Sequence, residues 1–299
     1  MRFSSSLPTK WAGFLVLGLA FSATAGCSAS SDGSGAPGGS ESLRPAPARA
    51  FNEGDPATWT LPMEAYLPSD DERRQMARAK NVLIGDCMKK AGFGQWRAAP
   101  ELPKVGPKTL TDWRYGIHDA GLSKRRGYKP EEGEQEAYDA AVEIGAVDGT
   151  SAGGADGKAL QVCRGEARTR LKGDVVDYAA EAQRLGNEAY VRAKEAPEVV
   201  AAFRAWSSCM AERGYRYKQP LDASDDPRFA TRDVTAEEIA AATADISCRD
   251  RTHVAKVWWQ AETGLQTASL EKHAETLNKS RKDMETAVKA AAAVLAGRQ

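Results

Sequence analysis

The chain has 299 residues, with 41 basic and 41 acidic side chains. This balance argues against a nucleic-acid partner, because such binding needs a concentrated basic face. Apolar residues make up 42% of the chain, which is ordinary for a globular protein and sufficient for a hydrophobic core. A chain of this length can form one large domain or two small ones.

The first 26 residues have the pattern of an export signal. Arg2 and Lys10 give a positive start, and residues 11–20 form an apolar run. That run is shorter than the roughly 20 residues that a membrane-spanning helix needs, and it suits a signal peptide. We therefore assign residues 1–26 to a signal peptide that is removed from the mature protein.

Small residues directly precede a cysteine after this run, in Thr24-Ala25-Gly26-Cys27. The order resembles a bacterial lipobox, in which the cysteine is acylated and becomes the first residue, although Thr24 stands where leucine is usual. We expect a diacylglyceryl group on Cys27, since lasting attachment to a bilayer needs more than one acyl chain. The alternative is an ordinary signal peptide that leaves Cys27 as a free thiol, which is unusual in a secreted protein.

Residues 28–50 are rich in Ser, Gly, Ala and Pro and have too little apolar surface to order themselves. We expect a flexible tether with an r.m.s. span of roughly 25 Å. Residues 27–61 are assigned to the acylated N-terminus and this tether. The predicted localisation is the extracytoplasmic face of the cell membrane, with the bilayer as a partner through Cys27.

A short motif occurs twice in the rest of the chain. Each copy reads Cys-Met, three residues, Gly, aromatic, and each is followed later by a Cys-Arg pair. The copies begin at Cys87 and Cys209, and the pairs are Cys163-Arg164 and Cys248-Arg249. This repetition predicts two related modules, residues 62–196 and residues 197–299.

Four cysteines remain when Cys27 is set aside, and export makes disulfides the default interpretation of an even number. Four cysteines allow three connectivities. The repeat favours Cys87–Cys163 and Cys209–Cys248, each stabilising by roughly 4 kcal/mol in the chain-entropy model. A zinc site is disfavoured, because zinc fingers place two ligands two to four residues apart. We therefore expect no metal and no other cofactor.

Helix-start signals and apolar spacing predict a mainly α-helical fold with a few short strands. Ser69 followed by Glu72 is a capping box for a helix from Asp70 to about Lys90. Gly92 suits the left-handed position just past that helix, and residues 93–96 are expected as a short strand.

Residues 97–157 are irregular, because Pro and Gly interrupt their periodicity. A helix is expected at 134–144, with Tyr138, Ala141 and Val142 facing inward, followed by a Gly-rich loop at 147–157.

A long helix is predicted after Cys163. Its apolar seam has alternating spacings of four and three, at Leu171, Val175, Tyr178, Ala182, Leu185 and Ala189. Pro197 begins the next helix, in which Val199, Phe203, Trp206 and Met210 face inward.

The C-terminal region begins with a loop at 221–229 and a capping box of Thr235 with Glu238. From there we expect helix nearly to the end, with a break at Gly264. Seven-residue spacing along this helix predicts a modest coiled-coil seam, interrupted at Arg281, through which the chain could self-associate. The seam residues are Leu270, Leu277, Met284, Val288 and Leu295.

A neighbouring histidine and aspartate, His118 and Asp119, could serve acid–base chemistry, but adjacent residues seldom face one substrate. Hydrogen bonds that hold a loop are the preferred interpretation. Carboxylates are abundant, but no pair is marked out as a glycosidase dyad. His253 and His273 lie on the predicted C-terminal helix and are interpreted as solvated or at the edge of the seam.

The sequence lacks the phosphate loop, and no Gly-x-Gly-x-x-Gly motif follows a predicted strand. Residues 148–156 faintly resemble a calcium loop but lack its alternating acids and closing glutamate. We therefore assign no catalytic, cofactor-binding or metal-binding residue.

Trp258 and Trp259 are a candidate binding patch. Most aromatic residues are expected in the core, but neighbours on a helix point about 100° apart, so both indoles cannot face one narrow seam.

Several of these segments resemble a family of lipoproteins from Streptomyces and related actinobacteria. They cover most of the chain after Pro62 and include Cys87-Met88 with Gly92-Phe93, Cys163-Arg164-Gly165-Glu166, Trp206 with Cys209-Met210, and Thr235 to Cys248. The resemblance implies an exported envelope protein and transfers no activity.

The leading hypothesis is a membrane-anchored extracytoplasmic protein that is not an enzyme and binds a transporter, another envelope protein or a wall component. The alternative is an extracellular enzyme acting on cell-wall material, with its site in residues 97–157. A deep cleft there lined by His118, Asp119 and other carboxylates would favour the enzyme. A filled aromatic core would favour the binding protein.

Overall fold

The helix signals in the sequence are realised as helices joined by turns and irregular segments, so the mainly α prediction is confirmed. The computed structural model describes residues 50–146 and 157–297. Cys27 and the predicted signal peptide lie outside this part. The longer helices are α1 (Asp70–Lys90), α3 (Glu132–Glu143), α4 (Gly157–Arg170), α5 (Val175–Ala193), α6 (Pro197–Glu212), α8 (Ala236–Thr252) and α9 (Val254–Ala296). The short elements are η1 (Pro56–Thr58), η2 (Pro62–Tyr66), α2 (Ala120–Arg126), α7 (Leu221–Ser224) and η3 (Pro227–Phe229).

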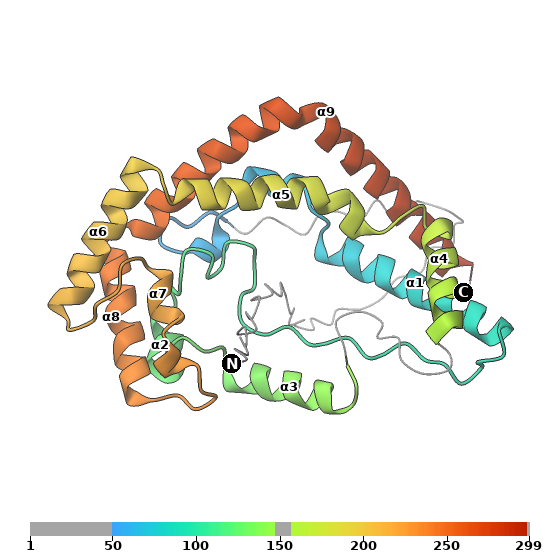
Figure 1. The fold of residues 1–299 in the computed structure, drawn as a ribbon, viewed down its shortest axis with the longest axis horizontal. Helices are drawn as coiled ribbons and strands as arrows, with labels where there is room; N and C mark the ends of the chain where they lie inside the picture. Colours follow the sequence, from blue (N-terminus) through green and yellow to red (C-terminus); the bar gives the residue numbers. More distant parts are fainter. Residues whose placement is uncertain (1–49, 147–156, 298–299) are drawn as a thin grey trace, which may run out of the picture.

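Helix α9 is the element along which the others are arranged (Figure 1). It packs along α5 and also contacts α1 and α6. The α8–α9 end of the molecule consists of α2, α6, α7, α8 and the beginning of α9. The α1–α4 end consists of α1, α4 and the last turns of α9. Because α9 belongs to the second predicted module while α1 and α5 belong to the first, the two modules share one packed interface.

The α8–α9 end contains the largest group of buried side chains. Trp206 and Met210 of α6 pack against Trp258 of α9, and all three are almost fully buried. Burial of a large apolar side chain contributes roughly 1.5–3 kcal/mol, so this cluster is a major source of stability. The Cys209–Cys248 disulfide joins α6 to α8 within it.

The α1–α4 end is smaller and simpler. Ile84 and Met88 of α1 pack against Leu160 of α4, and the Cys87–Cys163 disulfide joins the two helices. Both disulfides have the pairing that the repeat predicts. The Ser69 capping box at the start of α1 is also confirmed, because Ser69 and Glu72 each accept the backbone amide of the other.

The seam of α9 is covered by the same chain. Leu277 packs with Ala182 and Leu185 of α5, and Met284 packs with Met76 and neighbouring residues of α1. Arg281, which interrupts the seam, pairs with Glu72 at 2.8 Å. The side chains from which self-association was predicted are therefore already engaged in the core of one molecule.

The long helix expected after Cys163 is two helices. Lys172 and Gly173 both have positive φ, of 62° and 129°, and separate α4 from α5. The amide of Gly173 donates to the carbonyl of Arg168 at 2.9 Å, which closes the end of α4. The apolar seam nevertheless continues across the break, because Leu171 and Val175 are both buried.

The break predicted at Gly264 is also wrong. Gly264 lies inside α9, and the chain turns instead at His253, whose φ of 52° separates α8 from α9. A second irregularity falls at His273, where φ is −113°. Packing of α9 along α5 outweighs the cost of about 1 kcal/mol for a glycine in a helix.

Three further expectations are corrected. Residues 93–96 form a turn, and within the described residues the only β-type pairing is an isolated bridge between Trp113 and Gly116. Helix α3 buries none of its residues, and Val142 is 47% exposed, so its apolar stripe does not face a core. The loop expected at 221–229 contains α7 and η3.

The packed domain begins before residue 62. Trp59 and Leu61, which the sequence assigns to the tether, are both 3% exposed. Thr111 donates to the carbonyl of Trp59 at 2.7 Å and Thr109 to that of Ala57 at 3.0 Å, which pins this segment to the irregular region. Within the described residues, no helix is both long and apolar enough to cross a bilayer.

Candidate functional site

A cavity of about 340 Å³ lies at the junction of α8 and α9. Its walls come from the N-terminal segment, the loop around Gly116 and the start of α9. The residues with polar side chains among its lining are Glu53, His118, Arg249, Asp250, His253 and Lys256. Gly116, Ile117 and His118 of the irregular region line this cavity, which is the place to test for the cleft expected of an enzyme.

Gly116 shapes one wall of this cavity. Its φ is 104°, and a Cβ there would overlap the guanidinium of Arg249. Arg249 is 5% exposed and donates to Asp245 at 2.7 Å and to the carbonyl of Tyr115. The glycine therefore lets a buried arginine of α8 reach the backbone of the loop.

His118 is held by carboxylates on both sides. Its Nε2 lies 2.8 Å from Asp112 and its Nδ1 lies 3.5 Å from Asp55. A general base needs a ring nitrogen that faces its substrate, and neither nitrogen of His118 is free for that role. The hydrogen bond to Asp112 instead holds the loop together, and the contact with Asp55 faces the N-terminal segment.

Asp119 does not join His118 in the cavity. Its carboxylate accepts the amide of Leu122 at 2.8 Å and caps the N-terminus of α2. The two adjacent residues thus have separate roles, as their neighbouring positions suggest. Of the other histidines, His253 is exposed at the edge of the cavity, and His273 lies 3.7 Å from Glu181.

A buried ionic network lies behind the cavity wall. The Glu262 carboxylate is fully buried and accepts from Arg114 (2.7 Å), Tyr115 (2.9 Å) and Gln266 (2.8 Å). Burial lowers the pKa of Arg114, but Glu262 outweighs this effect and the net shift is upward. Burial and the Glu262 carboxylate raise the pKa of Tyr115 well above its ordinary value. These hydrogen bonds join α9 to the loop that carries Arg114 and Tyr115.

A second clamp joins α8 to the rest of this end. Asp245 is fully buried and accepts from Arg249 and from the indole of Trp206 at 2.8 Å. Burial raises the pKa of Asp245, and Arg249 opposes this shift. Glu238, expected to close the Thr235 capping box, instead accepts from the amide of Tyr128 at 3.1 Å and pairs with Lys129.

The candidate patch of Trp258 and Trp259 divides between core and surface. Trp258 is 1% exposed and packs edge-on to Phe203, at a ring distance of 5.1 Å. Trp259 is half-buried and its ring lies 5.1 Å from Trp59 and 6.0 Å from Phe51. Only Trp259 can contribute to a surface patch, and its aromatic neighbours come from the segment that was predicted to be tether.

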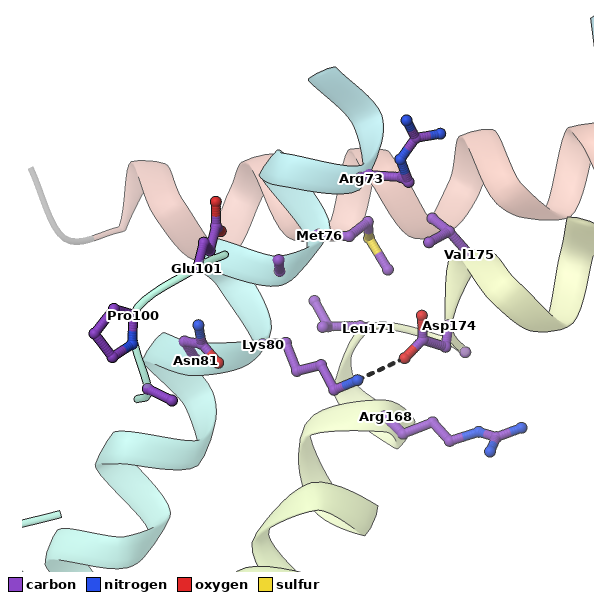
Figure 2. A pocket seen from close by; sticks show the side chains of 13 residues that line it. Arg73, Met76, Lys80, Asn81, Pro100, Glu101, Arg168, Leu171, Asp174 and Val175 are labelled. Carbon is purple, nitrogen blue, oxygen red and sulfur yellow. Dashed lines mark hydrogen bonds and ion pairs between the residues drawn. The ribbon is translucent and has the colours of Figure 1, made fainter. Parts of the chain in front are cut away.

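A second depression, of about 210 Å³, lies between α1 and the α4–α5 turn (Figure 2). Met76, Leu171 and Val175 give it apolar walls, and Lys80 pairs across it with Asp174 at 2.7 Å. Its other basic residues, Arg73 and Arg168, are also paired, with Asp70 and Asp177. The depression therefore offers apolar contacts but no uncompensated positive charge.

Neither depression has the donor set of a metal centre. Among residues 50–146 and 157–297, no three His, Cys, Asp or Glu side chains converge in a way that could hold a metal ion. Residues 148–156, with their faint resemblance to a calcium loop, lie outside the described part.

The ionic network around Glu262 was not predicted from the sequence. A signal was present, because Val254, Trp258, Glu262 and Gln266 recur every four residues and share one buried face of α9. Acidic residues are rarely buried unless they are paired, so the pattern did not predict a core position for Glu262. Its partners come from a segment about 150 residues earlier, which no local pattern reveals.

Comparisons of this chain with protein-family models, with curated proteins and with solved structures give no match. No activity or ligand therefore transfers from a relative.

Proposed function

We propose that this chain is an exported lipoprotein, anchored by an acylated Cys27, that binds another component of the cell envelope. The observation that carries the exported location is the pair of disulfides between helices, Cys87–Cys163 and Cys209–Cys248. Disulfides persist in oxidising compartments and are rare in the cytosol. The helical fold with two disulfides is therefore consistent with an extracytoplasmic protein.

The N-terminal sequence supports the anchor. A positive start, a short apolar run and small residues before Cys27 are the arrangement of a lipoprotein signal. The resemblance to actinobacterial lipoproteins points the same way. The balanced charge of the chain gives no polybasic alternative to an acyl anchor.

Mass spectrometry of the protein purified from its membrane tests the anchor. We expect an N-terminal peptide that begins at Cys27 and carries a diacylglyceryl group. Cys27→Ala should move the protein from the membrane fraction to the soluble fraction. A mature chain that starts elsewhere, with an unmodified thiol at Cys27, would refute the lipoprotein proposal.

A binding role is favoured over catalysis by how the polar residues of the α8–α9 end are used. His118, Glu262 and Arg249 are all engaged with side chains or backbone of the same chain. In-cell crosslinking, followed by mass spectrometry, should recover a discrete partner among transporters, envelope proteins or wall components. Substitution of the residues of this chain that the crosslinks identify should abolish capture of the partner.

The alternative is an extracellular enzyme that acts on wall material, and the cavity beside His118 is the feature that favours it. Incubation of the purified protein with isolated cell wall tests it by chromatography of released fragments. Fragments that are absent with His118→Gln would establish the enzyme and overturn the binding role.

A further inference from the structure

An exposed aromatic edge, consisting of Phe51 and Trp259, lies where the predicted tether joins the folded domain. Phe51 is 61% exposed, although it is one of the first residues that the structure describes. Its ring lies 6.0 Å from that of Trp259, and the Trp259 ring is tilted against the buried Trp59 at a centroid distance of 5.1 Å. The edge is therefore continuous with the aromatic core.

We propose that this aromatic edge rests in the interfacial region of the lipid bilayer. The inference rests on the proposed function, because the acylated Cys27 is what brings the domain to the membrane. Trp is enriched at the boundary between lipid and water, and Phe occurs with it on the apolar face of helices that lie in this interface. The indole Nε1 of Trp259 donates to the carbonyl of Thr60 at 3.1 Å, so its polar atom is already satisfied by the protein.

The place where the tether ends favours the bilayer over any other occupant. Phe51 follows Cys27 by 24 positions, and the tether that the sequence predicts for this length has an r.m.s. span of roughly 25 Å. A tether of this length gives an effective concentration in the millimolar range. Even a weak affinity for the interface is then enough to hold this face against the lipid.

The charges beside the edge indicate which lipids it accepts. Glu53 and Lys256 flank the aromatic residues and form an ion pair with each other. The charge of Lys256 is therefore already compensated by Glu53. Contact should therefore depend on the aromatic rings. Binding to zwitterionic vesicles and binding to anionic vesicles should agree within about twofold.

Hydroxyl-radical footprinting of the acylated protein in phosphatidylcholine vesicles tests this contact. We expect the oxidation of Phe51 and Trp259 to fall at least fivefold relative to the unacylated Cys27→Ala protein in solution. Tyr138 on α3 and Tyr178 on α5 should keep their rates. Equal oxidation of Phe51 in both samples would overturn the proposal.

Flotation of the Cys27→Ala protein with the same vesicles tests the edge without the anchor. Phe51→Ser should reduce the floated fraction at least threefold. Ile144→Ser, at a 72% exposed site where α3 ends, should not change it. Both positions are exposed, so neither variant should unfold. No flotation of the parent protein, or equal flotation of both variants, would contradict the proposal.

The two experiments separate failure of the edge from failure of the anchor. An unacylated Cys27 in the native protein refutes the anchor, yet flotation still reports on the aromatic edge. Protection of Phe51 in native membranes but not in protein-free vesicles would assign the edge to a protein partner and overturn the lipid contact.

Discussion

The two ends of the molecule each contain one disulfide between helices, but they stabilise their surroundings in different ways. At the α8–α9 end, Cys209 and Cys248 are fully buried among aromatic rings, and buried ion pairs such as Arg114–Glu262 join distant segments. At the α1–α4 end, Cys87 is half-buried and the nearby ion pair, Lys80–Asp174, is partly exposed. The two copies of the motif thus lie in different surroundings. Buried ion pairs stabilise the α8–α9 end, and the α1–α4 end depends mainly on its disulfide and on apolar contacts.

The difference shows what a disulfide adds in each setting. A covalent bond inside a dense core duplicates contacts that already hold the helices together. A bond between two helices with a small core is a larger share of what holds them. Four predictions test this contrast, and they are given from the largest expected effect to the smallest.

Removal of Glu262 should have the largest effect, because it leaves Arg114 buried without its partner. We expect Glu262→Ala to lower the free energy of unfolding by about 3–5 kcal/mol. Lys80→Ala at the other end should cost at most about 1 kcal/mol, since its pair is solvent-screened. Urea denaturation of both variants measures this, and similar costs would remove the contrast between the ends.

Loss of either disulfide should cost about 2–4 kcal/mol, but with different local consequences. In Cys87→Ala/Cys163→Ala, we expect amide exchange in α4 to accelerate selectively. In Cys209→Ala/Cys248→Ala, amide exchange should rise to the same extent in α6 and α8, because the two helices share one core and open together. Hydrogen-exchange mass spectrometry distinguishes the two patterns, and uniform acceleration in both variants would argue that neither end is locally independent.

A half-buried carboxyl near the Glu262 network should make stability depend on pH. Burial raises the pKa of Glu64 to about 7, although the Leu61 amide and Arg114 oppose this shift. The contribution of the protonated group is complete below about pH 4.5. It is lost as the pH rises to 7, because the unfolded chain ionises first, and it amounts to at most about 3 kcal/mol.

Glu64→Gln retains the acceptor for Leu61 and removes the charge, so it should be more stable than the parent at pH 8 and similar at pH 4. Thermal unfolding across this range gives the comparison. Parallel curves for the two proteins would show that Glu64 does not titrate between pH 4.5 and 7.

The smallest effect is expected at Gly264, in the helix that connects the ends. This glycine is exposed, and a Cβ there meets no atom within 4 Å. Gly264→Ala should therefore stabilise the protein by about 0.5–1 kcal/mol. Measured destabilisation would indicate that α9 bends at this position.

The sequence alone determined the local features whose causes lie within a few residues. The start of α1 follows from the Ser69–Glu72 capping box, and the start of α6 from Pro197. The inward face of α6 follows from apolar spacing, and the disulfide pairing follows from the repeated Cys-Met motif. The helix starts and the inward face are decided by nearest-neighbour sterics, hydrogen bonding and periodicity, whereas the disulfide pairing, between cysteines 76 and 39 residues apart, was predicted from the repetition of the motif.

Only the tertiary structure decided how these elements meet. It placed the break at His253 rather than Gly264, because packing of α9 along α5 outweighs the local cost of glycine. It joined Glu262 to Arg114, and it left Trp259 beside Phe51 while burying Trp258. These outcomes depend on contacts between residues far apart in the chain, whose free energies exceed the local preferences that a sequence displays.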